Sequence, residues 1–351
     1  MRSQGCDQQL ALRSEVGLES ASQLKKRLKS VGLSDAAINA AWPDWWSSAA
    51  SESTSAQTEL RFSIARKLGL DPHSLLEDSQ EPRFIWRDGA RFKHLSGEGR
   101  LELSAITSFG TALGRLLAAS TSEVAPLPNL NALELRKTIL RTQPYVRLLD
   151  LLSVCWSIGI PVVHLRVFPT LRKRMAAMSV QIDGHSVILM GKDSMYPPHV
   201  AFYLAHELGH VALGHLSKDS AIVDLESSAL AAPGEDPDEV STDRFALQLL
   251  TGLEEPKVLS KSKSYNANQL AHAVLNASTE LRIEPGTLAL CFGYSTGQWL
   301  KTNAAIKRVY SSPRPVWSEI NKVAADHLDL NRIPDDARSY VRAALGEAIA
   351  A

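Results

Sequence analysis

The stretch that decides the fold runs from Pro197 to Leu216 and reads PPHVAFYLAHELGHVALGHL. Its apolar residues recur at the spacing of one helix face, and two prolines suit a helix entry because the first turn leaves its amide hydrogens unused. A helix advances about 100° per residue, so His206 and His210 project within about 40° of each other, one turn apart. This spacing predicts a helix with two imidazoles turned toward one point.

The pentapeptide HELGH, residues 206–210, matches the metal-binding pattern H-E-x-x-H. Two imidazoles so placed hold Zn²⁺ at about 2.0–2.1 Å from each nitrogen. Glu207 is not needed as a ligand, and it is placed to accept a proton from a water molecule as a general base. The pattern fixes three residues and arises by chance on the order of a few per cent of the time. The apolar helix around it favours a metal, because buried histidine and glutamate are costly unless paired.

A catalytic zinc site takes three protein ligands and leaves a fourth position open. His215 is a poor third ligand, because on a continuous helix it projects about 140° away from His210. His199 is in phase with His206 but lies roughly 10 Å below it along the axis. Neither histidine is therefore expected to complete the site.

The acidic run EDPDEVSTD, residues 235–243, offers a better ligand. Asp236 before Pro237 is typical of a helix cap and first turn. Glu239 and Asp243 then lie one turn apart, so that Glu239 can bind the metal and Asp243 can orient a ligating imidazole. Acidic residues also favour helix starts in general, and Asp236 with Glu239 resembles a capping box. The spacing alone leaves both interpretations of Glu239 open.

Together, HELGH and the later pattern Glu239-x-x-x-Asp243-Arg-Phe-Ala-x-x-Leu-Leu resemble the ImmA/IrrE family of metallopeptidases. The second helix of that family typically reads E-x-E-A-(N/D)-x-F-A-x-x-L-L-M-P. Matched by position, Glu239 falls on the third metal ligand of the family. Ser241, Thr242 and residues 251–252 depart from the pattern without removing a ligand. The resemblance covers residues 160–250. It implies a zincin-like domain and a zinc-dependent endopeptidase whose substrate is often a helix-turn-helix repressor.

Composition narrows the class of protein. The chain has 351 residues, with 38 Lys and Arg against 38 Asp and Glu, so no overall field attracts nucleic acid or acidic lipid. Cys6, Cys155 and Cys291 have no paired spacing, which favours a reducing compartment and argues against a thiolate zinc site. The amino terminus lacks the apolar core of a signal peptide, and residues 151–163 are too few to span a bilayer. We therefore expect a cytoplasmic protein with no membrane contact.

The fold expected is mainly α with a small β-sheet, an α+β protein in which helical modules flank the peptidase domain. Strands are expected at 160–165, 178–182 and 185–190, with a tight turn at Asp183-Gly184. Residues 1–80 are expected to form a helical, degenerate helix-turn-helix-like module, and residues 81–130 a connector and a helix that end in a proline-marked linker at 123–131. The resemblance implies the metallopeptidase domain at 131–255, and residues 256–351 are expected to form a carboxy-terminal helical region. Residues 81–100 are interpreted as a connector, in which Arg91 and its basic neighbours form a solvated surface. Residues 218–235 are expected to form a loop.

Four short helices are expected between residues 23 and 76, and their order is similar to that of an XRE-type helix-turn-helix. The segment Pro43 to Ser51, which would have to read DNA, has no Arg, Lys, Asn or Gln to contact base edges. DNA binding is therefore disfavoured, and a degenerate module for binding a partner is preferred.

Two functions follow from the sequence. The first is a zinc endopeptidase that acts on a protein substrate, with His206, His210 and Glu239 as ligands and Glu207 as the base. The alternative is a non-proteolytic, antitoxin-like regulator that binds DNA or a partner and keeps a structural metal. A structural site has no need of Glu207, which favours the enzyme. The sequence indicates neither the target nor the oligomeric state.

Overall fold

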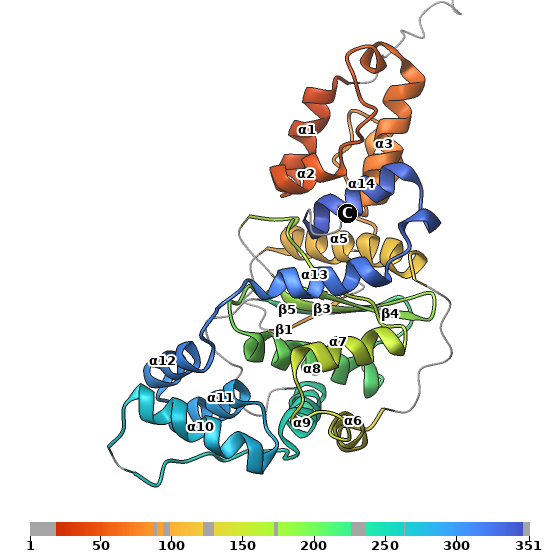
Figure 1. Ribbon diagram of the computed structural model, residues 1–351. Helices are drawn as coiled ribbons and strands as arrows, with labels where there is room; N and C mark the ends of the chain where they lie inside the picture. Colours follow the sequence, from red (N-terminus) through yellow and green to blue (C-terminus); the bar gives the residue numbers. More distant parts are fainter. Residues whose placement is uncertain are drawn as a thin grey trace, which may run out of the picture.

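A mixed sheet lies at the centre of the molecule, between two layers of helices (Figure 1). The computed structural model describes residues 19–86, 90–93, 99–121, 130–171, 175–225, 236–262 and 264–346. Within them the sheet has five strands in the order β1-β5-β3-β4-β2. The strands are β1 Ala90–Lys93, β2 Val162–His164, β3 Met175–Ile182, β4 His185–Met190 and β5 Ala221–Leu225.

The hairpin of β3 and β4 confirms the expected turn. Asp183 and Gly184 both have positive φ, at 48° and 86°, as a two-residue turn with matching strand twist requires. The two strands pair antiparallel from Ala177 opposite Met190 to Ile182 opposite His185. Strand β5 continues the antiparallel pairing on the other side of β3, while β1 and β2 add in parallel at the outer edges.

Two strands lie where the sequence was expected to form irregular structure. Residues 221–225 form β5 within the expected loop, and residues 90–93 form β1 within the expected connector. Both segments are short, and each is stabilised by a neighbour distant in sequence, which a local pattern does not reveal. The expected proline-marked linker after residue 122 lies mostly outside the described residues.

The two faces of the sheet carry different partners because side chains alternate along each strand. Met178 and Val180 of β3 pack in the core beneath α5, Arg100–Ala119, on one face. Ala177 packs on the other face, against α8, Pro197–Ala212. Helix α5 approaches β3 so closely at Gly110 that a Cβ there would lie 2.3 Å from Met178 Sδ. Ser179, next to Ala177 on the α8 side, is fully buried.

The helices up to residue 157 include the four that were expected between residues 23 and 76. They are α1 Ala21–Ser30, α2 Asp35–Ala41, α3 Thr54–Leu68, α4 Pro72–Leu76, α5, α6 Ala132–Ile139 and α7 Leu148–Ser157, with the short 3-10 helix η1 Ala50–Glu52. Ser34 and Asp71 cap α2 and α4, and Gly69 ends α3 in the left-handed conformation. The segment around Trp45 forms turns rather than a recognition helix. The Trp45 ring packs edge-on against the Trp46 ring.

The remaining helices are α8, α9 Pro237–Thr251, α10 Ala267–Leu281, α11 Pro285–Thr296, α12 Trp299–Val309, α13 Val316–His327 and α14 Asp335–Leu345, with η2 Leu330–Arg332. The last two do not stay with the carboxy-terminal region. Tyr340 of α14 is buried in the core of α1–α5, and Ile320 of α13 is buried in the core of α7–α9. These cores therefore cross the expected boundaries at residues 80, 130 and 255, whereas α10–α12 enclose a third core of their own.

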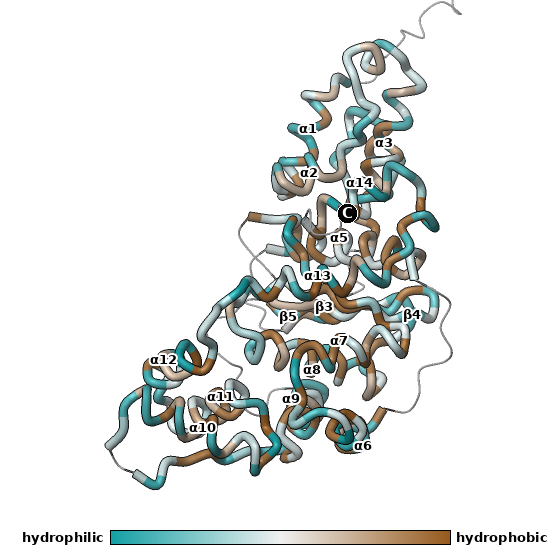
Figure 2. Tube along the Cα trace, viewed as in Figure 1, coloured by the Kyte–Doolittle hydropathy of each residue, from teal (hydrophilic) through white to brown (hydrophobic). Residues whose placement is uncertain are grey.

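The expected α+β class is confirmed, because the described residues are mainly helical with one small mixed sheet. Hydrophobic residues concentrate around β3 and the helices beside it (Figure 2). Among the described helices, none combines the length and the apolar character that crossing a membrane requires.

Candidate metal centre

Helices α8 and α9 meet at Gly209, the fourth residue of HELGH. A Cβ at this position would lie 2.9 Å from Thr242 Cγ2 and 3.2 Å from the Phe245 ring, so only glycine allows this approach. Asp236 caps α9 by accepting the amide hydrogen of Asp238 at 3.0 Å, as the sequence predicted. The close packing brings the first turn of α9 over the second half of α8.

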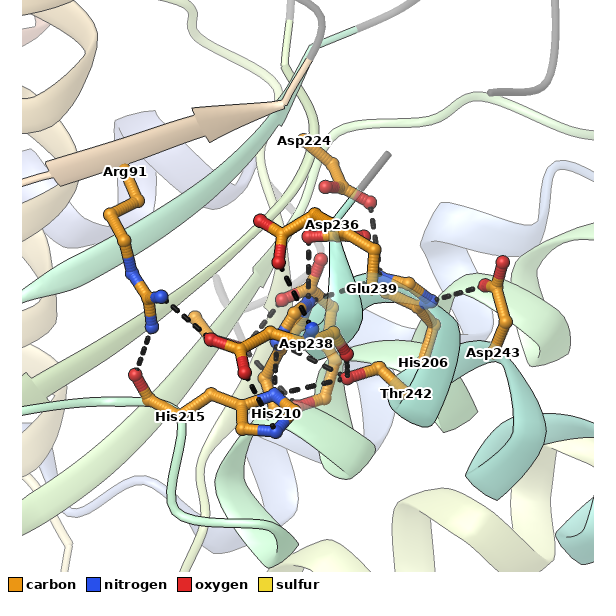
Figure 3. Close-up of polar contacts among 12 residues, drawn as sticks. Arg91, His206, His210, His215, Asp224, Asp236, Asp238, Glu239, Thr242 and Asp243 are labelled. Atoms are coloured by element: carbon orange, nitrogen blue, oxygen red, sulfur yellow. Dashed lines mark hydrogen bonds and ion pairs between the residues drawn. The ribbon is translucent and has the colours of Figure 1, made fainter. Parts of the chain in front are cut away.

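Three predicted ligands converge between these helices (Figure 3). His206 Nε2 lies 3.1 Å from His210 Nε2 and 3.3 Å from Glu239 Oε2, and His210 Nε2 lies 3.5 Å from Glu239 Oε1. Both imidazoles are buried, and the Glu239 side chain is 16% exposed. Ligand atoms around a four-coordinate zinc lie about 3.3 Å apart, given bonds of about 2.0–2.1 Å. The three side chains therefore have the spacing of one metal site.

Asp243 lies on the far side of His206, as Figure 3 shows. Its Oδ1 is 2.8 Å from His206 Nδ1, so the carboxylate accepts the Nδ1 hydrogen. This hydrogen bond leaves the lone pair of His206 on Nε2, the atom that faces His210 and Glu239. The expected contact between Asp243 and a ligating imidazole is present.

The structure places His215 close to His210, although a continuous helix was expected to turn it away. The helix was expected to continue to Leu216, but α8 ends at Ala212 and Gly214 turns the chain with φ 72°. His215 Nδ1 consequently lies 3.1 Å from His210 Nδ1. It is no ligand, because it contacts the nitrogen that points away from the centre.

Thr242 also contacts the outer nitrogen of His210. Its hydroxyl donates to the Asp238 carbonyl at 2.7 Å, so its oxygen accepts from an imidazole, and it lies 3.4 Å from His210 Nδ1. With His215 and Thr242 as acceptors, the proton of His210 belongs on Nδ1 and its lone pair on Nε2. Both His206 and His210 thus direct a lone pair toward the same point.

Glu207 is completely buried beside this point. Ser179 of β3 donates a hydrogen bond of 2.5 Å to Glu207 Oε2, while Oε1 has no hydrogen-bond partner within the described residues. Burial, and then the negative charge of Asp224, raise the pKa of Glu207 to about 8, although His206 and Ser179 oppose the shift. The carboxyl therefore holds a proton at neutral pH in the metal-free protein.

Asp224 is a residue that the sequence analysis missed. It lies on β5, is 4% exposed, and places Oδ2 3.7 Å from His206 Nε2. Its register position opposite Ala177 puts it on the same face of the sheet as Ser179. The alternating run Ala-Ile-Val-Asp-Leu is a weak strand signal, and it could have identified Asp224 as inward-facing.

Arg91 of β1 also corrects an expectation, because it does not simply face solvent. It donates to Asp238 Oδ2 at 2.7 Å and to the His215 carbonyl. This hydrogen bond lowers the pKa of Asp238. Arg91 thus ties the outer strand to the start of α9 and to the turn after α8 (Figure 3).

The arrangement fits a divalent cation. The Nε2 atoms of His206 and His210, each with a lone pair, lie 3.1 Å apart beside a carboxylate. These groups repel each other unless a proton or a cation lies between them. Two nitrogens and one carboxylate suit zinc and several other divalent ions, so the donor set does not select one metal. Oε1 of Glu207 is buried and has no hydrogen-bond partner within the described residues.

Comparison with models of protein families, with curated proteins and with solved structures found no significant match to this chain.

Proposed function

We propose that this protein is a metal-dependent endopeptidase of the ImmA/IrrE type. The observation that supports the proposal is the convergence of His206, His210 and Glu239 beside the buried carboxyl of Glu207. A purely structural metal site does not need an additional buried carboxyl group beside its three ligands.

The proposed roles follow from the contacts. His206, His210 and Glu239 would hold the metal, which when bound supplies a Lewis acid that polarises the scissile carbonyl. A bound cation would favour the ionised form of Glu207, which would accept a proton from the attacking water and then deliver it to the leaving amine. Ser179 holds one oxygen of Glu207, and the other has no hydrogen-bond partner within the described residues. Asp243 keeps the His206 ring in the tautomer that ligation requires.

The substrate class rests on the resemblance alone. It implies a protein substrate, such as an XRE-type repressor or another helix-turn-helix regulator. The alternative, a non-proteolytic regulator, draws support from Trp45, which is 41% exposed in the turns between α2 and η1. Such a protein would act through that surface and would keep its metal as a structural element.

Metal content per chain tests the site. Wild type purified without added metal should carry about one divalent ion, and Glu239→Ala should lose it. Glu254→Ala is the matched control, because Glu254 follows α9 and its side chain is 58% exposed. A metal-free wild type, even after zinc is offered and the excess removed, would overturn the proposal.

Cleavage is tested with a peptide library of defined composition, read by mass spectrometry of new termini. Wild type should produce new termini, and Glu207→Gln should abolish them while retaining the metal. Glu254→Gln should behave as wild type. If Glu207→Gln leaves a cellular function of the protein intact, the regulatory alternative replaces the peptidase.

A further inference from the structure

A cavity of about 310 Å³ lies between the core of α7–α9 and the core of α10–α12. Helices α8, α9, α11 and α12 all contribute to its wall. Most of its lining is apolar or aromatic, including Phe202, Tyr203, Leu247, Leu290, Tyr294 and Trp299. Junctions between cores are common places for binding sites. Two of the four helices are those that carry the proposed ligands.

The cavity is close to the metal centre along both shared helices. Tyr203 precedes His206 by one helical turn, and Leu247 follows Asp243 by one turn, so each step is about 5 Å along its axis. The rings of Phe202 and His206 are 6.3 Å apart between centroids. The α11 wall also reaches this region. Burial raises the pKa of Tyr294 most, and the charges of Tyr203 and Asp243 raise it further, so both groups lie near the Tyr294 side chain.

The chemistry of the wall selects an apolar occupant. The cavity is at the lower end of the range of about 300–1,000 Å³ found for small-molecule sites, which suits one large side chain better than an extended cofactor. Part of this apolar wall reaches the surface, because Tyr294 is 49% exposed. Exposed apolar surface around an apolar pocket is typical of a place where another polypeptide binds.

A polypeptide at the metal centre would reach the cavity within a few residues. An extended chain advances about 3.3–3.6 Å per residue, so a side chain one to three positions from the reacting bond spans the distance along α8. We propose that the α8–α11 cavity binds an aromatic or large aliphatic side chain of the polypeptide that the metal centre cleaves. This inference rests on the proposed function and assigns specificity to α11 and α12, which lie outside the region of family resemblance.

Binding is tested without any cleavage, on the zinc-loaded full-length chain labelled with 5-fluorotryptophan. The seven tryptophans give separate fluorine signals, and Trp299→Phe identifies the signal of Trp299. The probe is N-acetyl-L-phenylalaninamide, with N-acetyl-L-alaninamide as its small counterpart. The phenylalanine probe should shift the Trp299 signal saturably, and the alanine probe should bind at least about tenfold more weakly. No saturable shift of Trp299 overturns the proposal.

Two matched variants locate the binding. Leu247→Phe fills the cavity from α9 and should weaken the phenylalanine probe at least about tenfold, while Leu300→Phe adds the same ring at an exposed position and should change nothing. Cys291→Met, which fills the cavity from α11, replaces Leu247→Phe if that variant does not fold. Equal weakening by Leu300→Phe would place the probe on the surface and contradict the cavity.

The cleavage profile separates this inference from the proposed function. Wild type should prefer peptides with an aromatic or large aliphatic residue within three positions of the cut. Leu247→Phe should lower kcat/KM for those peptides by about 10- to 200-fold. It should leave kcat/KM unchanged for peptides that have alanine at the same position. Cleavage without this preference refutes the cavity assignment and leaves the peptidase standing. Probe binding in a protein that cleaves nothing refutes the peptidase and, with it, the substrate role of the cavity.

Discussion

Asp243 Oδ1 accepts the Nδ1 hydrogen of His206 at 2.8 Å, and the opposite nitrogen of the same ring faces His210 at 3.1 Å. One carboxylate, half exposed on α9, therefore fixes the tautomer of a buried ring on α8. The orientation of the donor set depends on this contact between helices.

Removal of Asp243 should weaken metal binding. Asp243→Ala is expected to lower zinc affinity about 10- to 100-fold, because His206 loses the acceptor that holds its ring and its tautomer. Competition with a chromophoric chelator measures the affinity. Arg244→Ala, one residue further along α9 and half exposed, is the control. Equal affinity in Asp243→Ala and wild type would show that the contact does not orient a ligand.

His215 and Thr242 should act on His210 as a pair. His215→Ala is expected to lower zinc affinity by no more than about tenfold, since Thr242 Oγ1 remains 3.4 Å from His210 Nδ1. The double variant His215→Ala/Thr242→Val should lose clearly more than the sum of the two single changes. Strict additivity, measured by the same competition, would mean that the two groups act independently.

Glu207 should make the metal-free protein less stable as the pH rises. Its pKa is raised from 4.5 to about 8 by burial and by Asp224, so the folded state keeps a proton that the unfolded state loses. The free energy of unfolding should therefore fall between about pH 4.5 and 8 at about 1.4 kcal/mol per pH unit, which is on the order of 5 kcal/mol over the whole range. Glu207→Gln removes this slope, whereas the exposed Glu254→Gln retains it. Urea unfolding in a chelator at pH 5 and pH 8 measures the difference, and parallel slopes would contradict it.

Asp224 should control the proton of Glu207 from the sheet. Its negative charge raises the pKa of Glu207, so Asp224→Asn should move that titration to lower pH in the metal-free protein. Infrared difference spectroscopy follows the protonated carboxyl band, which Glu207→Gln assigns by removing it. A titration that stays in place would show that Asp224 has little electrostatic effect on Glu207.

The contact between α3 and α14 should contribute to global stability. Lys67 is 2% exposed and its Nζ lies 3.5 Å from Asp336 Oδ2, which also accepts from Ser63 at 2.9 Å. Asp336→Ala leaves a buried ammonium group without its counter-charge and should lower the free energy of unfolding by about 2–3 kcal/mol. Asp335→Ala is the neighbouring control, because its side chain is 91% exposed. Denaturant unfolding compares the two, and equal losses would exclude a specific role for the pair.

Local spacing predicted the histidine pair, whereas the choice of Glu239 as third ligand rested on the family resemblance, because the spacing alone left a helix cap equally open. The four-residue interval between His206 and His210, and again between Glu239 and Asp243, placed each pair on one helix face, and the structure brings all four side chains together. The Asp183-Gly184 turn and its two strands were equally local. The roles of these residues in metal binding and catalysis stay predictions.

Long-range pairing explains what the sequence did not reveal. Asp224 reaches His206 only because β5 pairs with β3, and Arg91 reaches Asp238 only because β1 pairs with β5. His215 was misplaced for a local reason, since Gly214 favours the left-handed conformation that ends a helix. Gly214 is a signal for the end of a helix, but the apolar stripe that continues to Leu216 predicted a longer helix.

The position of α14 has a consequence for biosynthesis. Its buried Tyr340 and Val341 belong to the same core as Leu24 and Leu60 near the other end of the chain. On a ribosome the helices α1–α4 emerge first, yet their shared interior is completed only when residues 335–345 arrive. Helices α8 and α9 and strand β5 emerge well before that. The interior that α1–α4 share with α14 is therefore completed later than the segments of α8, α9 and β5 are synthesised.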